Sequence, residues 1–258
     1  TPSTSSAASD VYKRQSSING LGGVIAKKYY DEGAKLVVSG RRQEPLNQIA
    51  SELDGLAQTC DITKDGDVEK LFQVAKDKYG KVDIAVNTTG IYEPGNLNDL
   101  TRDHLRKYSE ISFIGSVIFI REAANILENL GSIITTTSVT VELSAIGLSG
   151  YVGTKAATDK IVQVAAKEYQ HKRLKINSLS PGLVDTPMTS ALFDMEQPIK
   201  AMEKESPLGR LANSEDVANT AVWMASDDCF TTGDFIRVGA GIHSVSYTHL
   251  TLPTRLMV

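Results

Sequence analysis

The sequence predicts a single-domain, three-layer α/β protein in which helices cover both faces of a doubly wound parallel sheet. Short apolar, β-branched runs alternate along the chain with longer amphipathic stretches, and this alternation is typical of parallel sheets with helical crossovers. With 258 residues, 41% of them hydrophobic, the chain can bury the core of one soluble domain of this kind. The mild net charge of −4 gives no reason to expect a nucleic-acid partner.

The cysteines and histidines indicate no metal site. Cys60 and Cys229 lack ligand spacing, and the four histidines are scattered. So few cysteines fit a reduced compartment, and we expect a cytoplasmic protein. No apolar run approaches the roughly 20 residues of a membrane span, so we expect no membrane partner.

Both ends of the chain are expected to be foreign to the protein. Residues 5–15 and 245–255 match translations of the two strands of one oligonucleotide that resembles a sequencing adapter. We therefore assign residues 1–15 and 245–258 as non-native segments and residues 16–244 as the domain. The first strand of the sheet would then have to come from residues 9–15, with Asp10, Lys13 and Arg14 inside it, or be missing.

A glycine-rich turn, Asn19 to Gly23, opens the first expected helix, which ends at Gly33. Backbone N–H groups in such a turn can approach a pyrophosphate at the positive end of the helix. A buried strand over 34–39 follows and leads into Arg41. No acidic residue occupies 39–42, and a basic residue at the end of this strand accommodates the 2′-phosphate of NADP.

The next expected elements are a helix over 44–53, a strand over 56–60 and an amphipathic helix over 65–79 that ends at Gly80. Asp61, after the strand, either receives an adenine amino group or caps the following helix. A strand over 82–86 then enters the polar turn from Asn87 to Gly90, which can pass beneath a cofactor.

Two helices are expected over 101–127, with close packing at Gly115, and a strand over 132–137 follows them. Ser138 ends this strand, at the edge where open α/β sheets bind ligands. The next helix, over 150–169, carries Tyr151 and Lys155 one turn apart on one face. An ammonium beside a phenol favours the phenolate, so we expect Lys155 to lower the pKa of Tyr151.

The last part of the chain is expected to hold a strand over 174–179, a helix over 214–226 and a strand over 234–238. Pro181 and Gly182 follow the first of these strands. Residues 189–207 are polar and lack a clear pattern, which suits a lid over a substrate pocket.

Over residues 16–241 the sequence resembles the short-chain dehydrogenase/reductase family, whose fold is of the Rossmann type. Its landmarks appear in the family's order: Gly20-x-Gly22, Asp61, Asn87-x-x-Gly90, Ser138, Tyr151-x-x-x-Lys155 and Pro181-Gly182 leading to Thr186. Ser138 precedes Tyr151 by thirteen residues, a spacing familiar in the family.

The resemblance implies a role for each matching residue. Tyr151 would be the acid/base, Lys155 would bind the nicotinamide ribose, and Ser138 would bond the substrate oxygen. Ser112 stands where the family often has the asparagine of a water relay. The residues expected to bind the cofactor are Ser17, Asn19, Gly20, Leu21, Gly22, Arg41, Asp61, Ile62, Asn87, Gly90, Tyr151, Lys155, Pro181, Gly182, Val184 and Thr186.

The sequence thus predicts an enzyme that interconverts a carbonyl and an alcohol, prefers NADP(H) to NAD(H), and acts as a reductase in the cell. Its substrate would be a small carbonyl or alcohol, either a 3-oxoacyl thioester or a general ketone. By analogy with the family we expect a homotetramer or homodimer. The alternative from another class is a non-catalytic dinucleotide-binding regulator on the same fold.

Overall fold

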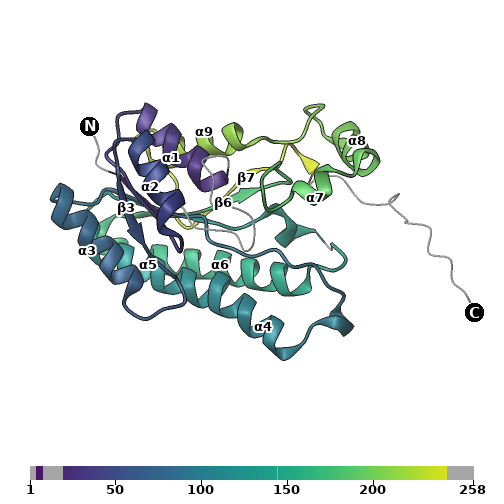
Figure 1. Ribbon diagram of the computed structural model, residues 1–258, viewed down its shortest axis with the longest axis horizontal. Coiled ribbons are helices and arrows are strands. Elements are labelled where there is room, and N and C mark those ends of the chain that lie inside the picture. Colours follow the sequence, from purple (N-terminus) through teal and green to yellow (C-terminus); the bar gives the residue numbers. More distant parts are fainter. Residues whose placement is uncertain (1–3, 8–19, 144, 243–258) are drawn as a thin grey trace, which may run out of the picture.

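Seven parallel strands form the centre of the structure, a computed structural model that describes residues 4–7, 20–143 and 145–242 (Figure 1). Five of these strands are hydrogen-bonded in the order β1–β4–β5–β6–β7, and β2 pairs with β3. β2 also contacts β1, so the pair extends the five-stranded sheet. The strands are β1 (Thr4–Ala7), β2 (Val37–Gly40), β3 (Leu56–Thr59), β4 (Ile84–Asn87), β5 (Ser132–Thr136), β6 (Lys175–Pro181) and β7 (Phe235–Val238).

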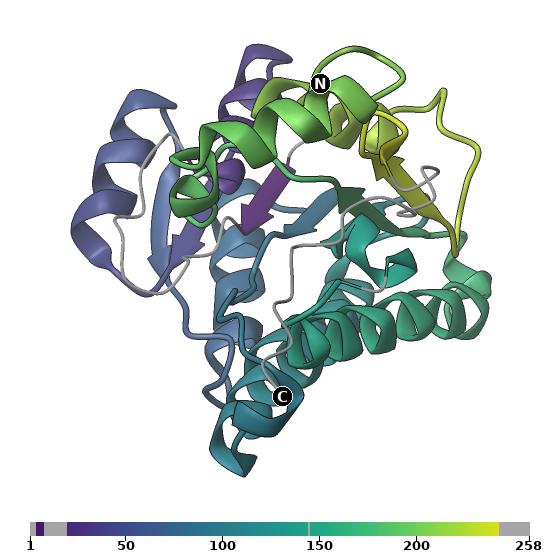
Figure 2. The ribbon, with the colours of Figure 1, turned by 90° about the vertical axis from the view of Figure 1, so that its right-hand side faces the viewer.

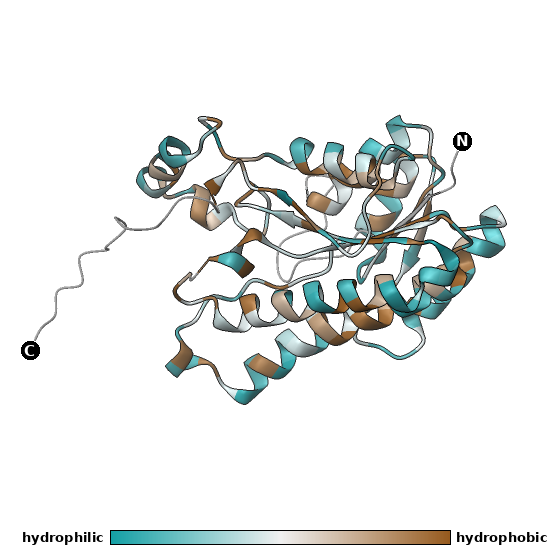
Figure 3. Ribbon diagram, turned by 180° about the vertical axis from the view of Figure 1, so that it is seen from behind, coloured by the Kyte–Doolittle hydropathy of each residue, from teal (hydrophilic) through white to brown (hydrophobic). Residues whose placement is uncertain are grey.

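Helices cover both faces of the sheet, as the sequence predicts (Figures 1 and 2). One face carries α1 (Leu21–Asp31), α2 (Gln43–Glu52) and α9 (Ser214–Ala225), and the other carries α3 (Asp67–Tyr79), α5 (Gly115–Ile126) and α6 (Ser149–Glu168). Each face has its own apolar cluster. Figure 3 shows apolar residues along the strands and on the helix sides that face them.

Several helix boundaries follow from local chemistry. The predicted stripe of α3 (Val68, Leu71, Phe72 and Ala75) is buried, and Gly80 ends the helix with φ 81°. At the start of α9, Asn213 and Asp216 form a capping box. Elements of one turn or so complete the chain: the 3₁₀ helices η1 (Leu97–Asp99), η3 (Val139–Glu142) and η4 (Gln170–Lys172), and the α-helix α7 (Ser190–Phe193).

The stretch over 101–127 forms one continuous helical segment in which the helix type changes twice. It consists of α4 (Arg102–Tyr108), a π-helix η2 (Ser109–Ile114) and α5. The predicted close packing at Gly115 is confirmed, because a Cβ there would lie 2.8 Å from a side-chain carbon of Ile62. This contact sets the start of α5 against the loop that follows β3.

One sequence prediction is wrong in detail, and one stretch is more regular than its composition suggests. The strand beside β4 is Thr4–Ala7, with Thr4 opposite Ile84, rather than a segment within residues 9–15. Four small residues are long enough to match the four of β4, so the ladder does not require Asp10, Lys13 or Arg14, which lie outside the described residues.

The patternless stretch over 189–207 is also more regular than predicted. It contains α7 and the ten-residue α8 (Glu196–Glu205). No residue of either helix is fully buried. The sequence of α8 is amphipathic, with Ile199 and Met202 three residues apart, but this short pattern lies among polar residues and sequence reasoning missed it. Both lie on the same side of the sheet as α1 and α9 (Figures 1 and 2).

Within the described ranges, no helix combines the length and apolar character needed to cross a membrane. No group of three or more histidine, cysteine, aspartate or glutamate residues is placed to hold a metal ion in those ranges either.

Candidate active site

The carboxyl ends of the strands gather most of the predicted site residues. Arg41 follows β2, Asp61 follows β3, and Asn87 ends β4. Ser138 lies two residues beyond β5, and Pro181 is the last residue of β6. Because the strands are parallel, these ends lie along one edge of the sheet. These residues, scattered from position 41 to position 181 of the sequence, therefore meet in space.

Tyr151 and Lys155 lie in the first turns of α6, as predicted. The Lys155 side chain is 3% exposed, and its ammonium donates hydrogen bonds to the carbonyl oxygens of Thr136 (2.7 Å) and Thr89 (3.3 Å). The Nζ atom lies 5.9 Å from the centroid of the Tyr151 ring. Strand β5 and the turn after β4 thus hold the ammonium on the Tyr151 side of the helix.

The predicted lowering of the Tyr151 pKa is not what the structure shows. Burial raises the pKa of Tyr151 to about 12, and a side-chain hydrogen bond with Ser138 only partly opposes this rise. The phenols of Tyr92 and Tyr108 add to it. Lys155 is not among the causes of the shift, since its ammonium is turned to backbone carbonyls. The phenol is therefore protonated at neutral pH.

The pKa of Lys155 is lowered by burial, the same effect that raises the pKa of Tyr151. Burial disfavours the ammonium and lowers the pKa of Lys155 to about 8, while the charge of Asp159 acts to raise it. Lys155 is therefore still largely charged at neutral pH and loses its charge in the mildly alkaline range.

Ser138 caps η3 and is 8% exposed. Its hydroxyl oxygen accepts hydrogen bonds from the backbone N–H (3.2 Å) and the hydroxyl (2.9 Å) of Thr140. A serine oxygen has two acceptor sites and one proton. Because Thr140 fills both acceptor sites, the Ser138 hydroxyl acts as a donor toward Tyr151 or toward a bound oxygen atom.

Ser112 lies inside the π-helix and is fully buried. Its carbonyl oxygen accepts hydrogen bonds from the hydroxyls of Ser116 (2.8 Å) and Thr158 (2.9 Å), so it is tied to α6. Its own hydroxyl has no hydrogen-bond partner among the described residues. A buried hydroxyl without a partner calls for an explanation, and an ordered water molecule is one.

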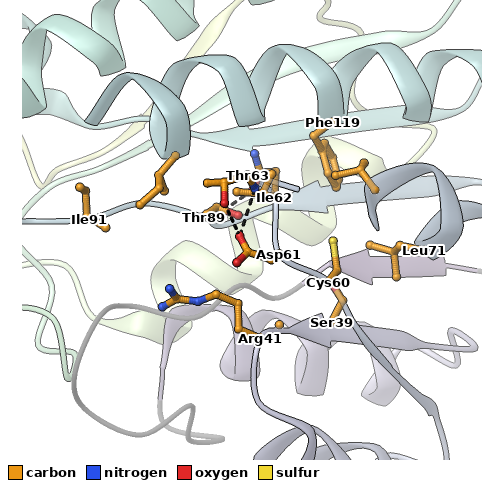
Figure 4. A pocket seen from close by; sticks show the side chains of 14 residues that line it. Ser39, Arg41, Cys60, Asp61, Ile62, Thr63, Leu71, Thr89, Ile91 and Phe119 are labelled. Carbon is orange, nitrogen blue, oxygen red and sulfur yellow. Dashed lines mark hydrogen bonds between the residues drawn. The ribbon is translucent and has the colours of Figure 1, made fainter. Parts of the chain in front are cut away.

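A cleft of about 630 Å³, counted with the space open to solvent, lies beside this group of residues. Arg41, Asp61, Ile62 and Asn87 line it, together with Thr89 (Figure 4). The carbonyl of Thr89 bonds the Lys155 ammonium, so the cleft leads to the catalytic candidates. Its size, its mixed polar and apolar lining and its place at the strand ends fit a dinucleotide.

Asp61 does not cap α3, one of the two alternatives that the sequence leaves open. The N-cap of α3 is Gly66, and a carboxylate oxygen of Asp61 instead accepts bonds from the N–H and hydroxyl of Thr63 (Figure 4). The other side of Asp61 lines the cleft, where an adenine could reach it.

Asn87 and Gly90 shape the turn after β4. The Asn87 side chain is buried, where it accepts from the Thr89 N–H (2.9 Å) and donates to Ser116 and Thr135. A Cβ on Gly90 would lie 3.2 Å from Nζ of Lys155. Glycine at this position therefore lets the turn pass close to the ammonium, where a larger side chain would crowd it.

The remaining predicted cofactor residues are placed only in part. Gly20 is the N-cap of α1 with no side-chain cap, and Leu21 and Gly22 begin the helix. Ser17 and Asn19 lie outside the described residues. Gly182, Val184 and Thr186 follow β6, and the hydroxyl of Thr186 bonds that of Thr189 (3.0 Å).

Sequence reasoning missed residues that act through their backbone or through a neighbour. Thr89 and Thr136 hold Lys155 by carbonyl oxygens, which any residue type would supply. Tyr92 packs edge-on against Tyr151, with ring centroids 5.6 Å apart. Asp159 is the exception, since its position four residues after Lys155 is visible in the sequence.

The arrangement of these residues fits a dinucleotide-binding oxidoreductase, and comparison with known proteins agrees. A family model described as enoyl-(acyl carrier protein) reductase matches residues 16–243. The chain is 31% identical over 230 residues to an uncharacterized oxidoreductase of Mycobacterium bovis, covering 86% of this chain and 92% of that protein. It is 28% identical to the 3-oxoacyl-[acyl-carrier-protein] reductase of Bos taurus, covering 86% and 93%.

Two further similarities complete the comparison. The chain is 28% identical to the 3alpha-hydroxysteroid dehydrogenase of Mediterraneibacter gnavus, covering 87% of this chain and 93% of that one. Its fold matches the crystal structure of an enoyl-(acyl-carrier-protein) reductase from Anaplasma phagocytophilum with a TM-score of 0.85, 22% identity and 95% coverage of both chains. The chain belongs to the short-chain dehydrogenase/reductase family and is an NAD(P)-dependent oxidoreductase.

Proposed function

We propose that this enzyme reduces a carbonyl group to a secondary alcohol, with NADP(H) as the preferred cofactor and Tyr151 as the acid. The observation that carries the proposal is the hydrogen-bonded pair of Ser138 and Tyr151 beside the buried ammonium of Lys155. Two hydroxyls and one cation held close together suit an oxygen atom on which negative charge develops.

The protonation state of Tyr151 supports the direction of reduction. Its pKa of about 12 keeps the phenol protonated, and reduction of a carbonyl needs a proton donor at the oxygen atom. The nicotinamide, when bound, supplies the hydride. Ser138, with both acceptor sites filled by Thr140, offers its own proton as a second hydrogen bond to the same oxygen.

Lys155 and Ser112 have supporting roles in this proposal. Two of the three ammonium donors of Lys155 bond carbonyl oxygens, and the third suits a ribose hydroxyl. The unpartnered hydroxyl of Ser112 would hold a water molecule that returns protons toward Lys155.

Arg41 supports the preference for NADP(H). Its exposed guanidinium lines the cleft at the end of β2, and no acidic residue occupies 39–42. A guanidinium pairs with a phosphate in a forked contact, whereas a ribose hydroxyl pair calls for a carboxylate.

The substrate proposal rests on the relatives and stays broad. The Bos taurus relative is named for 3-oxoacyl chains and the Mediterraneibacter gnavus relative for hydroxysteroids. Both names describe carbonyl and alcohol pairs, so we propose a small carbonyl or alcohol substrate, either a 3-oxoacyl thioester or a general ketone. A homotetramer or homodimer is proposed by analogy with the family.

The test is NADPH oxidation by the purified protein with a panel of ketones and 3-oxoacyl thioesters. Tyr151→Phe removes only the hydroxyl and should reduce kcat by about 100-fold or more, the contribution of a general acid. The affinity for NADPH should stay nearly unchanged. Full activity of Tyr151→Phe would refute the assignment, and tight NADPH binding by wild type without turnover would favour the non-catalytic regulator.

A further inference from the structure

Helix α6 carries a third ionisable residue in line with Tyr151 and Lys155. Asp159 follows Lys155 by four residues, as Lys155 follows Tyr151, so the three share one stripe of the helix. Its side chain is 6% exposed. The Oδ1 atom of its carboxyl group has no hydrogen-bond partner among the described residues. A buried, incompletely bonded carboxyl is costly and calls for an explanation.

The surroundings of Asp159 come from three other elements. Side-chain hydrogen bonds from Ser178, on β6, and Thr137, after β5, lower the pKa of Asp159, although the Oδ1 atom itself has no partner within hydrogen-bond distance among the described residues. Arg237 on β7 also lowers the pKa of Asp159, but this guanidinium is engaged by the carboxylate of Glu142 on η3 (2.8 and 2.9 Å). The charge of Asp234 also acts to raise the pKa of Arg237. Burial outweighs these groups and raises the pKa of Asp159.

Asp159 is the acidic residue nearest to Lys155 along α6. The hydrogen-bond acceptors of Lys155, the carbonyl oxygens of Thr89 and Thr136, are neutral. Asp159 is the one charged group that raises the pKa of Lys155 against burial. An ammonium in this position is close to losing its proton, so a single nearby charge has a large effect on its state.

We propose that Asp159 is a positioning residue: its buried carboxylate, one helical turn from Lys155, keeps Lys155 in the ammonium form. The inference rests on the proposed role of Lys155 and adds Asp159 to the residues that support it. Asp159 does not touch the reacting atoms and acts only through Lys155.

The direct test is the titration of Lys155 by NMR in the full chain, with the Nζ and Cε signals assigned through a Lys155→Arg variant. Asp159→Asn keeps the shape of the side chain and removes its charge. A unit charge one turn away, in a medium of effective dielectric constant about 20, shifts a pKa by on the order of one unit. The midpoint of Lys155 should therefore fall by about that amount in Asp159→Asn, and Asp159→Glu should restore it.

A matched control exists on α1. Lys27 and Asp31 form an exposed i,i+4 pair at 2.9 Å, the same pairing of residue types on a helix. Asp31→Asn removes the same formal charge and should leave both the Lys155 titration and the activity unchanged. This control separates a local effect from a change in the net charge of the protein.

The activity test has a defined sign. A lysine with a lower pKa becomes neutral at a lower pH, so the alkaline decline of kcat/KM should begin about one unit earlier in Asp159→Asn. Near pH 6, below both midpoints, the variant and the wild type should have equal activity. A merely structural role of Asp159 would lower activity at every pH.

The outcomes separate this inference from the proposed function. An unchanged Lys155 midpoint in Asp159→Asn overturns the inference. A shifted midpoint with an unchanged pH profile supports the inference and refutes the catalytic role of Lys155. If Asp159→Asn does not fold, the charge state of Asp159 can be measured by comparing infrared spectra of wild type and Asp159→Glu. A protonated carboxyl band of Asp159 at pH 7 overturns the inference. An ionised carboxylate supports it.

Discussion

Replacing Gly90 by alanine should displace the Lys155 ammonium while the fold is kept. A Cβ at this position would lie 3.2 Å from Nζ and 3.6 Å from Cε of Lys155, whereas carbon contacts are comfortable at about 3.5–4.0 Å. The φ of Gly90 is not positive, so alanine meets no backbone strain. The lysine side chain is the flexible partner, and it must move by a few tenths of an ångström.

The size of the effect follows from the two hydrogen bonds of the ammonium. The bond to Thr89 is already 3.3 Å long and would be lost, whereas the 2.7 Å bond to Thr136 can survive. A hydrogen bond from a charged group contributes about 1.5–3 kcal/mol, and Gly→Ala returns about 0.4–1 kcal/mol through the unfolded chain. The net destabilisation of about 1–2 kcal/mol should lower Tm by about 2–8 °C.

The assay compares thermal unfolding and steady-state kinetics of wild type, Gly90→Ala and Gly153→Ala. Gly153 lies on α6 between Tyr151 and Lys155, and a Cβ there meets nothing within 4 Å. Gly153→Ala should therefore be neutral or stabilise the helix by up to about 1 kcal/mol.

Gly90→Ala should also reduce kcat/KM by about 10-fold, since misplacement of a catalytic group by 1 Å can cost about 100-fold. If Gly90→Ala has the Tm and kcat/KM of wild type, the close contact between the turn and Lys155 has no role, and this reasoning fails.

Three further predictions concern the cofactor, the relay and the start of the chain. Gly40→Asp with Arg41→Ile should swing the ratio of kcat/KM values from NADPH toward NADH, because a carboxylate accepts ribose hydroxyls and repels a 2′-phosphate; an unchanged ratio would mean that Arg41 does not contact the phosphate. Ser112→Asn should keep or raise activity and Ser112→Val should lower it, because a buried water would lose a partner; equal rates in all three proteins would remove Ser112 from the mechanism. Replacing residues 1–15 with an apolar strand ending in Thr-Gly should raise Tm and the thermal shift produced by NADPH; equal values would show that residues 1–15 serve as an adequate start.

The order and type of most elements could be predicted because their signals are local. The stripe of α3, the glycine after it and the apolar runs of β2 and β4 depend only on residues near in sequence. The site motifs were equally visible, since each stands at the end of a strand or in the first turns of α6. The same reasoning failed for α8, because its short amphipathic pattern, with Ile199 and Met202 three residues apart, was missed among polar residues.

The sequence by itself therefore determines the alternation of strands and helices, the glycines that end helices or allow them to pack closely, and the spacing of Tyr151 from Lys155. The electrostatic state of the site depends on tertiary structure. Sequence spacing predicts that Lys155 lowers the pKa of Tyr151, but burial of the phenol and the turn of the ammonium toward Thr136 reverse that result. Desolvation and charge act through distances across β5, α6 and β7, and only the folded arrangement sets those distances.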